Sequence, residues 1–254
     1  MVAKLLPLVP LHKRYIEVFG GGAALLWAKP PVEVEVYNDL DGGLVHFFRV
    51  LQDFEQFEML YHRLQYTLYS RQEFNDVRAT WEAEIDPVIR AHKWYIVARM
   101  SFSGHFGNSW SSSVTTSVRG MAKTTSSWLS AIESLPRFHK RVQRVQVEQA
   151  DFRDILNRYD TAETFFYLDP PYVSSTRSAG GYKHEITDKD HRDLIEIILN
   201  LQGKVLLSGY PNPIYNQLIE NGWHYKEWQT ICHAARVKQP RVEAVWANYD
   251  LTNP

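Results

Sequence analysis

The sequence has little cysteine and no long apolar run. Its single cysteine, Cys232, excludes a disulfide framework and a zinc site built on several cysteines, and it is typical of a reducing compartment. No apolar stretch approaches the ~18 residues of a membrane helix, and residues 1–10 form no signal-peptide pattern. The ten histidines are scattered without metal-ligand spacing. We therefore expect a cytoplasmic protein with no membrane segment and no metal.

The chain contains ample material for folded domains. Of its 254 residues, 44% are hydrophobic and 22% are charged, which excludes wholesale disorder. At roughly 150 residues per domain, this length predicts one large domain or a core that carries an insertion. Strand and helix patterns alternate in residues 1–52 and again in 142–254, whereas residues 53–141 are mostly helical. The sequence thus predicts an α/β domain in two parts, 1–52 and 142–254, interrupted by a helical insertion at 53–141.

The net charge of −1 hides an uneven distribution along the chain. Residues 86–145 hold nine lysines and arginines against two acids, a local charge of about +7, so the remainder sums to about −8. An inserted basic segment of this kind is typical of proteins that bind polyanions. A solvated helical face explains the same charges, and charge alone leaves both interpretations open.

Alternation of strands and helices indicates a doubly wound, mainly parallel sheet. We expect strands at residues 15–19, 32–37, 142–147, 165–168 and 204–208, with an antiparallel pair at 223–229 and 241–249. Helix starts are predicted at Ser70, Asp86 and Thr187. Parallel sheets bind ligands beyond the carboxyl ends of their strands. Two conspicuous motifs each follow a predicted strand, so we expect them to meet at one edge of the sheet.

The first motif is a run of three glycines, Gly20, Gly21 and Gly22, between a strand and a helix. Glycines let the backbone approach a ligand closely, and the start of the helix offers free amides. The dinucleotide fingerprint is excluded because its third glycine would fall at Leu25. Asp39 follows the next strand, where its carboxylate is suited to the hydroxyls of a ribose. Together they predict a nucleoside-containing cofactor, with a purely structural turn as the alternative.

The second motif, Asp169-Pro170-Pro171-Tyr172, is sharper. The prolines stiffen the backbone and remove two amide donors, so the Asp169 carboxylate and the Pro170 carbonyl present only acceptors. A planar amino group with two N–H bonds suits these acceptors, and Tyr172 offers a ring on which a base can stack for ~1–3 kcal/mol. Acceptors that draw the amino lone pair out of conjugation prepare it to attack an electrophile. A structural Pro-Pro turn is the alternative.

The order of these motifs resembles that of Dam-type DNA adenine methyltransferases, most closely their phage-borne members. The resemblance covers nearly the whole chain through Glu17-Val18-Phe19, the glycines, Asn38-Asp39, Asp151-Phe152, Asp169-Pro170-Pro171-Tyr172, Ser208-Gly209-Tyr210, Arg241-Val242-Glu243, Trp246 and Asn248-Tyr249. It implies a Rossmann-like methyltransferase fold, S-adenosylmethionine as cofactor, double-stranded DNA as substrate and no metal. It also implies methylation of the exocyclic amino group of an adenine that is flipped out of the duplex.

The resemblance also implies roles for individual residues. The methionine end of the cofactor would lie against Phe19, Gly20, Gly21 and Gly22, its ribose against Asp39, and its adenine against Asp151 and Phe152. Asp169 would border the cofactor and, with Pro170, Pro171 and Tyr172, receive the target base. The insertion would contact DNA through Arg99, His105, Asn108, Arg119, Lys123, Lys140 and Arg141, with Arg90, Lys93 and Arg144 as further phosphate contacts.

Parts of the insertion are ambiguous. Residues 103–108 resemble the family's base-reading loop, and Phe106 and Trp110 are either base contacts or local core. Twelve of residues 109–130 are serine or threonine, which is typical of a flexible loop, although hydroxyls also contact phosphates. His184 and His191, outside the insertion, are predicted at the surface or in loops rather than as catalytic groups.

Two departures from the family pattern bear on activity. The family's aromatic-Gly-Gly-Lys element, part of its cofactor site, has no counterpart ahead of Met1-Val2-Ala3-Lys4, and its Glu-Pro-Phe is Glu17-Val18-Phe19 here. We expect the valine to be tolerated, and loss of the first element to weaken cofactor binding or abolish activity. The alternatives are a catalytically inactive DNA-binding remnant and a cytosine-amino methyltransferase, a class that more often has serine at position 169. The recognition sequence, the oligomeric state and a cognate restriction nuclease as partner are left open.

Overall fold

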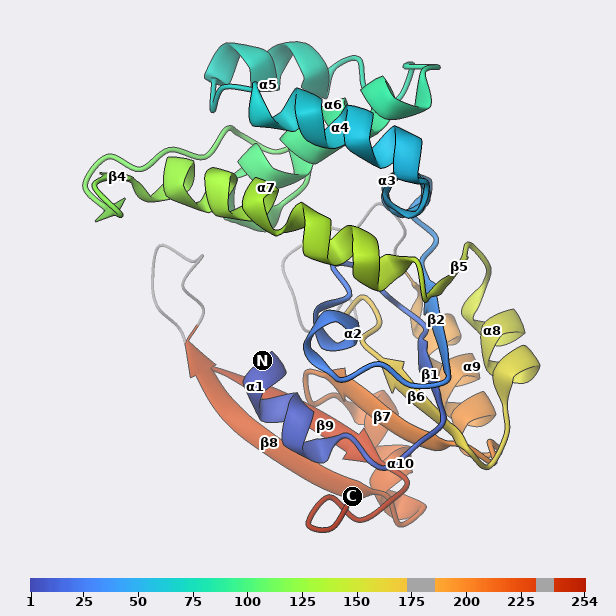
Figure 1. The fold of residues 1–254 in the computed structure, drawn as a ribbon. Coiled ribbons are helices and arrows are strands. Elements are labelled where there is room, and N and C mark those ends of the chain that lie inside the picture. The colour runs from blue at the N-terminus through green and yellow to red at the C-terminus, as the bar shows by residue number, and fades with distance from the viewer. Residues whose placement is uncertain (173–185, 232–239) are drawn as a thin grey trace. The chain divides into compact units, whose positions relative to one another are not determined.

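The computed structural model describes residues 1–172, 186–231 and 240–254, and the chain divides into two compact units (Figure 1). An α/β unit comprises Met1–Asp41 and Val145–Pro254, and a helical unit comprises Gly42–Arg144. The predicted boundaries at 53 and 141 both lie inside the helical unit. The boundary at 53 falls inside it because the helix following residue 41 packs against other helices of that unit.

The α/β unit is built on a sheet that has, within the described residues, seven strands in the order β5-β2-β1-β6-β7-β9-β8. The strands are β1 (Arg14–Glu17), β2 (Val34–Asn38), β5 (Gln146–Glu148), β6 (Thr164–Leu168), β7 (Lys204–Gly209), β8 (His224–Ile231) and β9 (Pro240–Ala247). The first five are parallel, whereas β9 runs antiparallel to both β7 and β8. This arrangement confirms the predicted Rossmann-like sheet and its antiparallel terminal pair.

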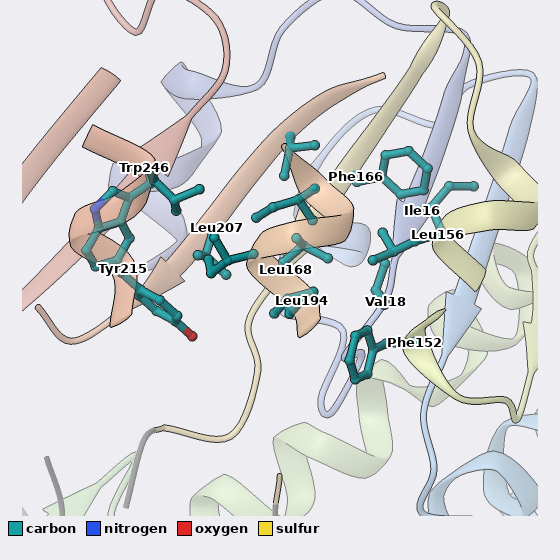
Figure 2. Packing of buried hydrophobic residues seen from close by; sticks show 14 of the residues in the cluster. Ile16, Val18, Phe152, Leu156, Phe166, Leu168, Leu194, Leu207, Tyr215 and Trp246 are labelled. Atoms are coloured by element: carbon teal, nitrogen blue, oxygen red, sulfur yellow. The ribbon is translucent and has the colours of Figure 1, made fainter. Parts of the chain in front are cut away.

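Both faces of the central strands are buried, which explains their nearly continuous apolar sequences. Ile16 of β1 lies beside Phe166 of β6 and Phe166 beside Val205 of β7, and all three are fully buried on one face. Figure 2 shows this face packed against helices that carry Leu156 and Leu194. Each such side chain contributes about 1.5–3 kcal/mol through burial. The core therefore holds the strand ends in fixed register.

The helices of the α/β unit are α1 (Val2–Leu5), α2 (Ala24–Ala28), α8 (Phe152–Tyr159), α9 (Asp188–Ile198) and α10 (Asn216–Glu220), with short 3₁₀ turns at Leu6–Leu8 and Pro213–Tyr215. Thr187 caps α9 as predicted. Its side chain accepts the Asp190 N–H, and the Asp190 carboxylate accepts the Thr187 N–H in return. Helices α8 and α9 lie next to each other (Figure 1).

The helical unit contains α3 (Gly42–Gln52), α4 (Phe54–Gln65), α5 (Arg71–Arg78), α6 (Pro87–Met100) and α7 (Lys123–Val142), a 3₁₀ turn at Phe102–Gly104, and a hairpin of β3 (Ser117–Val118) and β4 (Met121–Ala122). Helix α6 packs against α3, α4 and α5, which explains why it is apolar on most sides. The predicted starts at Ser70 and Asp86 are confirmed, since their side chains accept the N–H groups of Glu73 and Ile89.

Two predictions of local structure are wrong. Residues 109–130 are not one flexible loop, because they include the β3–β4 hairpin and the first turns of α7. Residues 142–147 are not one strand, because α7 runs to Val142 and β5 begins only at Gln146. Both errors have the same cause: Trp128, Ile132, Leu135 and Val142 recur at helical spacing and are buried, so tertiary packing extends the helix at both ends.

Candidate active site

The carboxyl ends of the parallel strands share one edge of the sheet. The residues predicted to bind a cofactor or to react follow those ends directly: Phe19, Gly20, Gly21 and Gly22 after β1, Asp39 after β2, Asp151 and Phe152 after β5, and Asp169, Pro170, Pro171 and Tyr172 after β6. The fold therefore brings to one edge groups that come from both parts of the interrupted unit, as expected for a ligand site of this class of sheet.

The three glycines of the turn differ in the space around their α-carbons. A Cβ on Gly20 would lie 2.1 Å from the Tyr37 ring, so packing requires this glycine. Gly21 has a φ of +46°, and a Cβ on Gly21 or Gly22 would meet nothing within 4 Å. The backbone at Gly21 and Gly22 therefore has open space beside it.

Asp39 is anchored to this turn. Its Oδ2 accepts the Gly21 N–H at 2.7 Å, and its Oδ1 accepts the Asp41 N–H at 2.7 Å. The Tyr37 hydroxyl donates to the Gly21 carbonyl at 2.9 Å, so both backbone polar groups of Gly21 are hydrogen-bonded to side chains at the end of β2. The orientation of the half-buried carboxylate is thus fixed by backbone amides, close to the open side of the turn.

Asn38 joins three of the strand-end loops, a role that the sequence analysis missed. Its Nδ2 donates to the carbonyls of Val18 (2.9 Å) and Ala150 (3.0 Å), and its Oδ1 accepts the Ala150 N–H (2.9 Å). The side chain is 2% exposed. Its place at the carboxyl end of a predicted strand was the available signal, but its partners come from loops before and after it in the chain, one of them distant in sequence.

Glu17 was also missed as an individual residue. Its carboxyl group is 2% exposed and accepts hydrogen bonds from the Tyr15 hydroxyl (2.7 Å) and the Leu26 N–H (3.0 Å). It therefore ties the first turn of α2 to the end of β1 and supports the glycine turn between them. Burial raises the pKa of Glu17 to about 8, because the charged form loses its hydration.

Asp151 and Phe152 begin α8, where their side chains already have protein partners. Asp151 accepts the Arg153 N–H as the helix cap, and both its oxygens lie 3.1 Å from the Arg153 guanidinium. Phe152 is buried, and its ring centroid lies 5.6 Å from that of Phe19. The structure therefore brings the two predicted aromatic cofactor contacts together on adjacent loops.

The corner after β6 lines a cavity. Asp169 Oδ1 accepts the Ser208 hydroxyl at 2.9 Å, and the Tyr172 ring lies against Tyr210 with centroids 4.2 Å apart. The cavity has a volume of about 80 Å³ and is lined by Met1, Asp169, Tyr172, Ser208, Gly209 and Glu243. Complete ligand sites have ~300–1,000 Å³. The cavity is thus smaller than a complete ligand site. Residues of the corner after β6 line it, but the glycine turn and Asp39 do not.

The Asp169 carboxylate is exposed on the side of the cavity, but it is crowded by protein elsewhere. Desolvation raises the pKa of Asp169 to about 6; the Ser208 hydrogen bond opposes the rise and the nearby Glu243 carboxylate adds to it. Asp169 is therefore an ionised, acceptor-only group at neutral pH that loses its charge in mild acid.

The helical unit carries the residues predicted to contact DNA. The side chains of six of them are exposed: Arg99, His105, Asn108, Arg119, Lys123 and Lys140. Arg141 is half-buried, and Arg119 lies 3.4 Å from the Glu133 carboxylate. Lys93, a further predicted phosphate contact, pairs with Glu84 at 2.8 Å.

The loop before Trp110 is held by its own hydrogen bonds. The Phe102 N–H donates to the Ser109 carbonyl (2.7 Å), and the Gly107 N–H donates to the Ser101 hydroxyl (3.0 Å). Phe106 packs against the rings of Trp81 and Trp94, and Trp110 packs against Tyr69. Both rings therefore pack on neighbouring aromatic side chains, but Phe106 is still 40% exposed and Trp110 is half-buried, so neither belongs to the fully buried core, and His105 and Asn108 are exposed in the same loop.

The predicted surface or loop position of His191 is wrong. It is fully buried on the inner face of α9, with Nδ1 2.9 Å from the Tyr215 hydroxyl. Its spacing from Leu194, Ile195 and Ile198 places it in the apolar stripe of the helix, which outweighs the polarity of the imidazole. His184 lies outside the described residues.

Two kinds of feature are absent from the described residues. No group of three or more histidine, cysteine, aspartate or glutamate side chains among them is arranged to hold a metal ion. None of the helices in this part of the chain combines the length and apolar character needed to cross a membrane.

Comparison with known families gives one match. Residues 1–232 match the model of the D12 class N6 adenine-specific DNA methyltransferases. The matched range includes all five parallel strands, their end loops and the whole helical unit. No curated protein sequence matches the chain.

Proposed function

The chain belongs to the D12 class N6 adenine-specific DNA methyltransferase family, and we propose that it transfers a methyl group from S-adenosylmethionine to an adenine flipped out of duplex DNA. The observation that carries the proposal is the acceptor-only corner at Asp169, which opens into a cavity beside Tyr172 on the same sheet edge as an open glycine turn. An amino group and a nucleoside cofactor are the ligands that suit these two features.

The residues of the glycine turn fit the cofactor. The space beside Gly21 and Gly22 suits a chain that lies against the backbone, and Asp39 is oriented for ribose hydroxyls. Phe19 and Phe152 offer neighbouring rings for the adenine moiety. When bound, S-adenosylmethionine supplies an electrophilic methyl group on a sulfonium centre. Asp151 already caps α8 and pairs with Arg153. Its carboxylate oxygens would use their remaining lone pairs to accept hydrogen bonds from the cofactor.

The corner after β6 would hold the reacting amino group. Asp169 and the Pro170 carbonyl would each accept one of its N–H bonds, which orients the nitrogen lone pair and withdraws it from the ring. Tyr172, supported by Tyr210, would stack on the base. Flipping is required because the amino group is buried in the base pair, and unstacking costs a few kcal/mol that the pocket must recover.

The helical unit would bind the duplex. The exposed cations at Arg99, Lys123 and Lys140 suit phosphate contacts, as does Arg141 at the end of α7. His105 and Asn108 extend from a hydrogen-bonded loop and would reach base edges. Arg119 would contact DNA by exchanging its Glu133 partner for a phosphate.

A direct test incubates the purified full chain with methyl-labelled S-adenosylmethionine and duplex DNA, and identifies the modified base by mass spectrometry. We expect labelled N6-methyladenine, and a loss of at least about 100-fold in the Asp169→Ala variant with DNA binding retained, because one catalytic acceptor is removed. Labelled cytosine would identify a cytosine-amino enzyme. No transfer together with no cofactor binding in calorimetry would identify an inactive DNA-binding remnant.

A further inference from the structure

Ser208, at the end of β7, contacts the carboxylate of the neighbouring corner. It is 3% exposed, and its hydroxyl lies 2.9 Å from Asp169 Oδ1 and 3.2 Å from the Leu168 carbonyl. Leu168 of β6 is paired with Leu207 of β7. Because the strands are parallel, Asp169, the first residue after β6, lies beside Ser208, which is still within β7 and paired with Val245 of β9. The contact is thus built by strand register and not by a flexible loop.

A second hydroxyl orients Ser208. The Tyr167 hydroxyl lies 3.1 Å from Ser208 Oγ and is buried. Burial raises the pKa of Tyr167 well above its usual range, so it keeps its proton and can donate. A serine hydroxyl has one proton and two lone pairs. With Tyr167 donating to it, Ser208 is free to direct its own proton to the ionised Asp169, the stronger acceptor.

We propose that Ser208, oriented by Tyr167, is a positioning residue that fixes the Asp169 carboxylate for methyl transfer. The hydrogen bond occupies Oδ1, and no described residue donates a hydrogen bond to Oδ2, which leaves that oxygen for the amino group of the base. This inference rests on the proposed function, since it assigns Ser208 a part in presenting Asp169 to an adenine.

A pH profile separates this role from a purely structural one. The Ser208 hydrogen bond stabilises the charged form of Asp169 and lowers its pKa, against the larger effect of desolvation. In the wild type, kcat/KM should fall about tenfold per pH unit below about pH 6. Removal of the hydroxyl should raise the Asp169 pKa, so that this acid limb, the fall in rate at low pH, moves to higher pH. A serine that only fills space would leave the limb where it is.

The test compares single-turnover methylation by wild type, Ser208→Ala, Ser208→Thr and Tyr167→Phe between pH 5 and pH 9, with cofactor and DNA affinities measured in parallel. We expect Ser208→Ala to be roughly 10- to 100-fold slower at pH 8, because the carboxylate is misaligned. Its acid limb should lie at higher pH, and both affinities should be unchanged. Ser208→Thr retains the hydroxyl and should recover most of the rate, and Tyr167→Phe should be intermediate.

Tyr249→Phe is the matched control, because it removes a partly buried tyrosine hydroxyl that donates to the Leu8 carbonyl at 2.8 Å instead of to the corner. It should keep the wild-type rate and acid limb. A wild-type rate and limb in folded Ser208→Ala would overturn the inference. If that variant does not fold, an unchanged rate and limb in Tyr167→Phe would overturn it. Failure of the wild type to methylate DNA, or full activity of Asp169→Ala, would instead contradict the proposed function.

Discussion

Two carboxyl groups with raised pKa values stand at the ends of neighbouring strands, Glu17 on β1 and Asp169 after β6. They differ in access to solvent. Glu17 is enclosed and bonded to the Tyr15 hydroxyl and a helix amide, whereas Asp169 opens into the cavity. The first supports the turn beside the site, and the second provides an acceptor within it.

Replacement of Glu17 by glutamine tests this distinction through stability. The folded-state pKa of about 8 lies above the ordinary 4.5, so between these values the folded chain binds a proton that the unfolded chain releases. The contribution of Glu17 is therefore full below about pH 4.5 and is lost as pH rises through about 8. We expect Glu17→Gln to gain stability relative to wild type as pH rises from 5 to 9.

Urea denaturation at pH 5, 7 and 9 measures this difference. Both the Tyr15 hydroxyl and the Leu26 N–H donate to the same oxygen of Glu17, and the glutamine side chain keeps one oxygen that can accept both, so the variant should fold. A difference in unfolding free energy that is the same at all three pH values would contradict the prediction.

At the scale of elements, Arg153 clamps α8 to α9. Its Nη2 lies 2.6 Å from Asp190 and 2.7 Å from Asp193, and its Nη1 lies 3.1 Å from Asp151. These carboxylates raise the pKa of Arg153, with Asp190 the largest contributor. A guanidinium shared among three acids stabilises the packing of two helices and neutralises acids that would otherwise repel each other.

We expect Arg153→Ala to lower the free energy of unfolding by about 1–2 kcal/mol at low salt and by less at high salt, since the side chain is 32% exposed and the ion pairs are partly screened. The matched control is Arg158→Ala on the same helix, which loses one ion pair with Glu148 from a side chain that is 55% exposed. Denaturation of both variants at two salt concentrations measures the difference. Equal effects of the two substitutions would argue against a clamp.

The sequence predicted the elements better than their connections. The glycine turn, the Asp169 corner and the capped start of α9 carry local signals, because glycine, proline and cap residues act on their own backbone. Asn38 and Glu17 carry no such signal, since the partners of Asn38 lie on other loops and Glu17 joins its own strand to the following helix. The Ser/Thr-rich start of α7 misled for a related reason: Trp128 and Ile132 are buried against neighbouring helices, and packing overrides weak propensity.

At the scale of the whole molecule, charge is divided within the helical unit as well as between the units. The unit has thirteen lysines and arginines against nine acids, whereas the remainder has fifteen against twenty. Residues 53–84 hold seven of those nine acids, so the excess of positive charge belongs to α6, α7 and the residues between them. The proposed DNA surface is therefore this half of the unit and not the half formed by α4 and α5.

Neutralising Lys140 and Arg141 together as glutamines should reduce the slope of log affinity for duplex DNA against log salt concentration by about two, because each lost phosphate contact releases about one counterion fewer. The control neutralises Lys189 and Arg192, two cations with exposed side chains on α9 of the α/β unit, and should leave the slope unchanged. Fluorescence anisotropy over a range of salt concentrations measures both. An unaltered slope in the first variant would remove these residues from the DNA surface.

In the centre of the sheet, Tyr15 of β1 pairs with Phe165 of β6. In the sequence, β1 precedes the helical unit and β6 follows it. During synthesis, β1 and β2 emerge long before β6. Their apolar side chains therefore remain without their β6 neighbours while the intervening helices form local contacts. Folding of those helices shortens the tether between the two halves of the sheet and lowers the entropy cost of closing it. The insertion thus constrains assembly: the pairing of β1 with β6 at the catalytic edge cannot form until the whole helical unit has been synthesised.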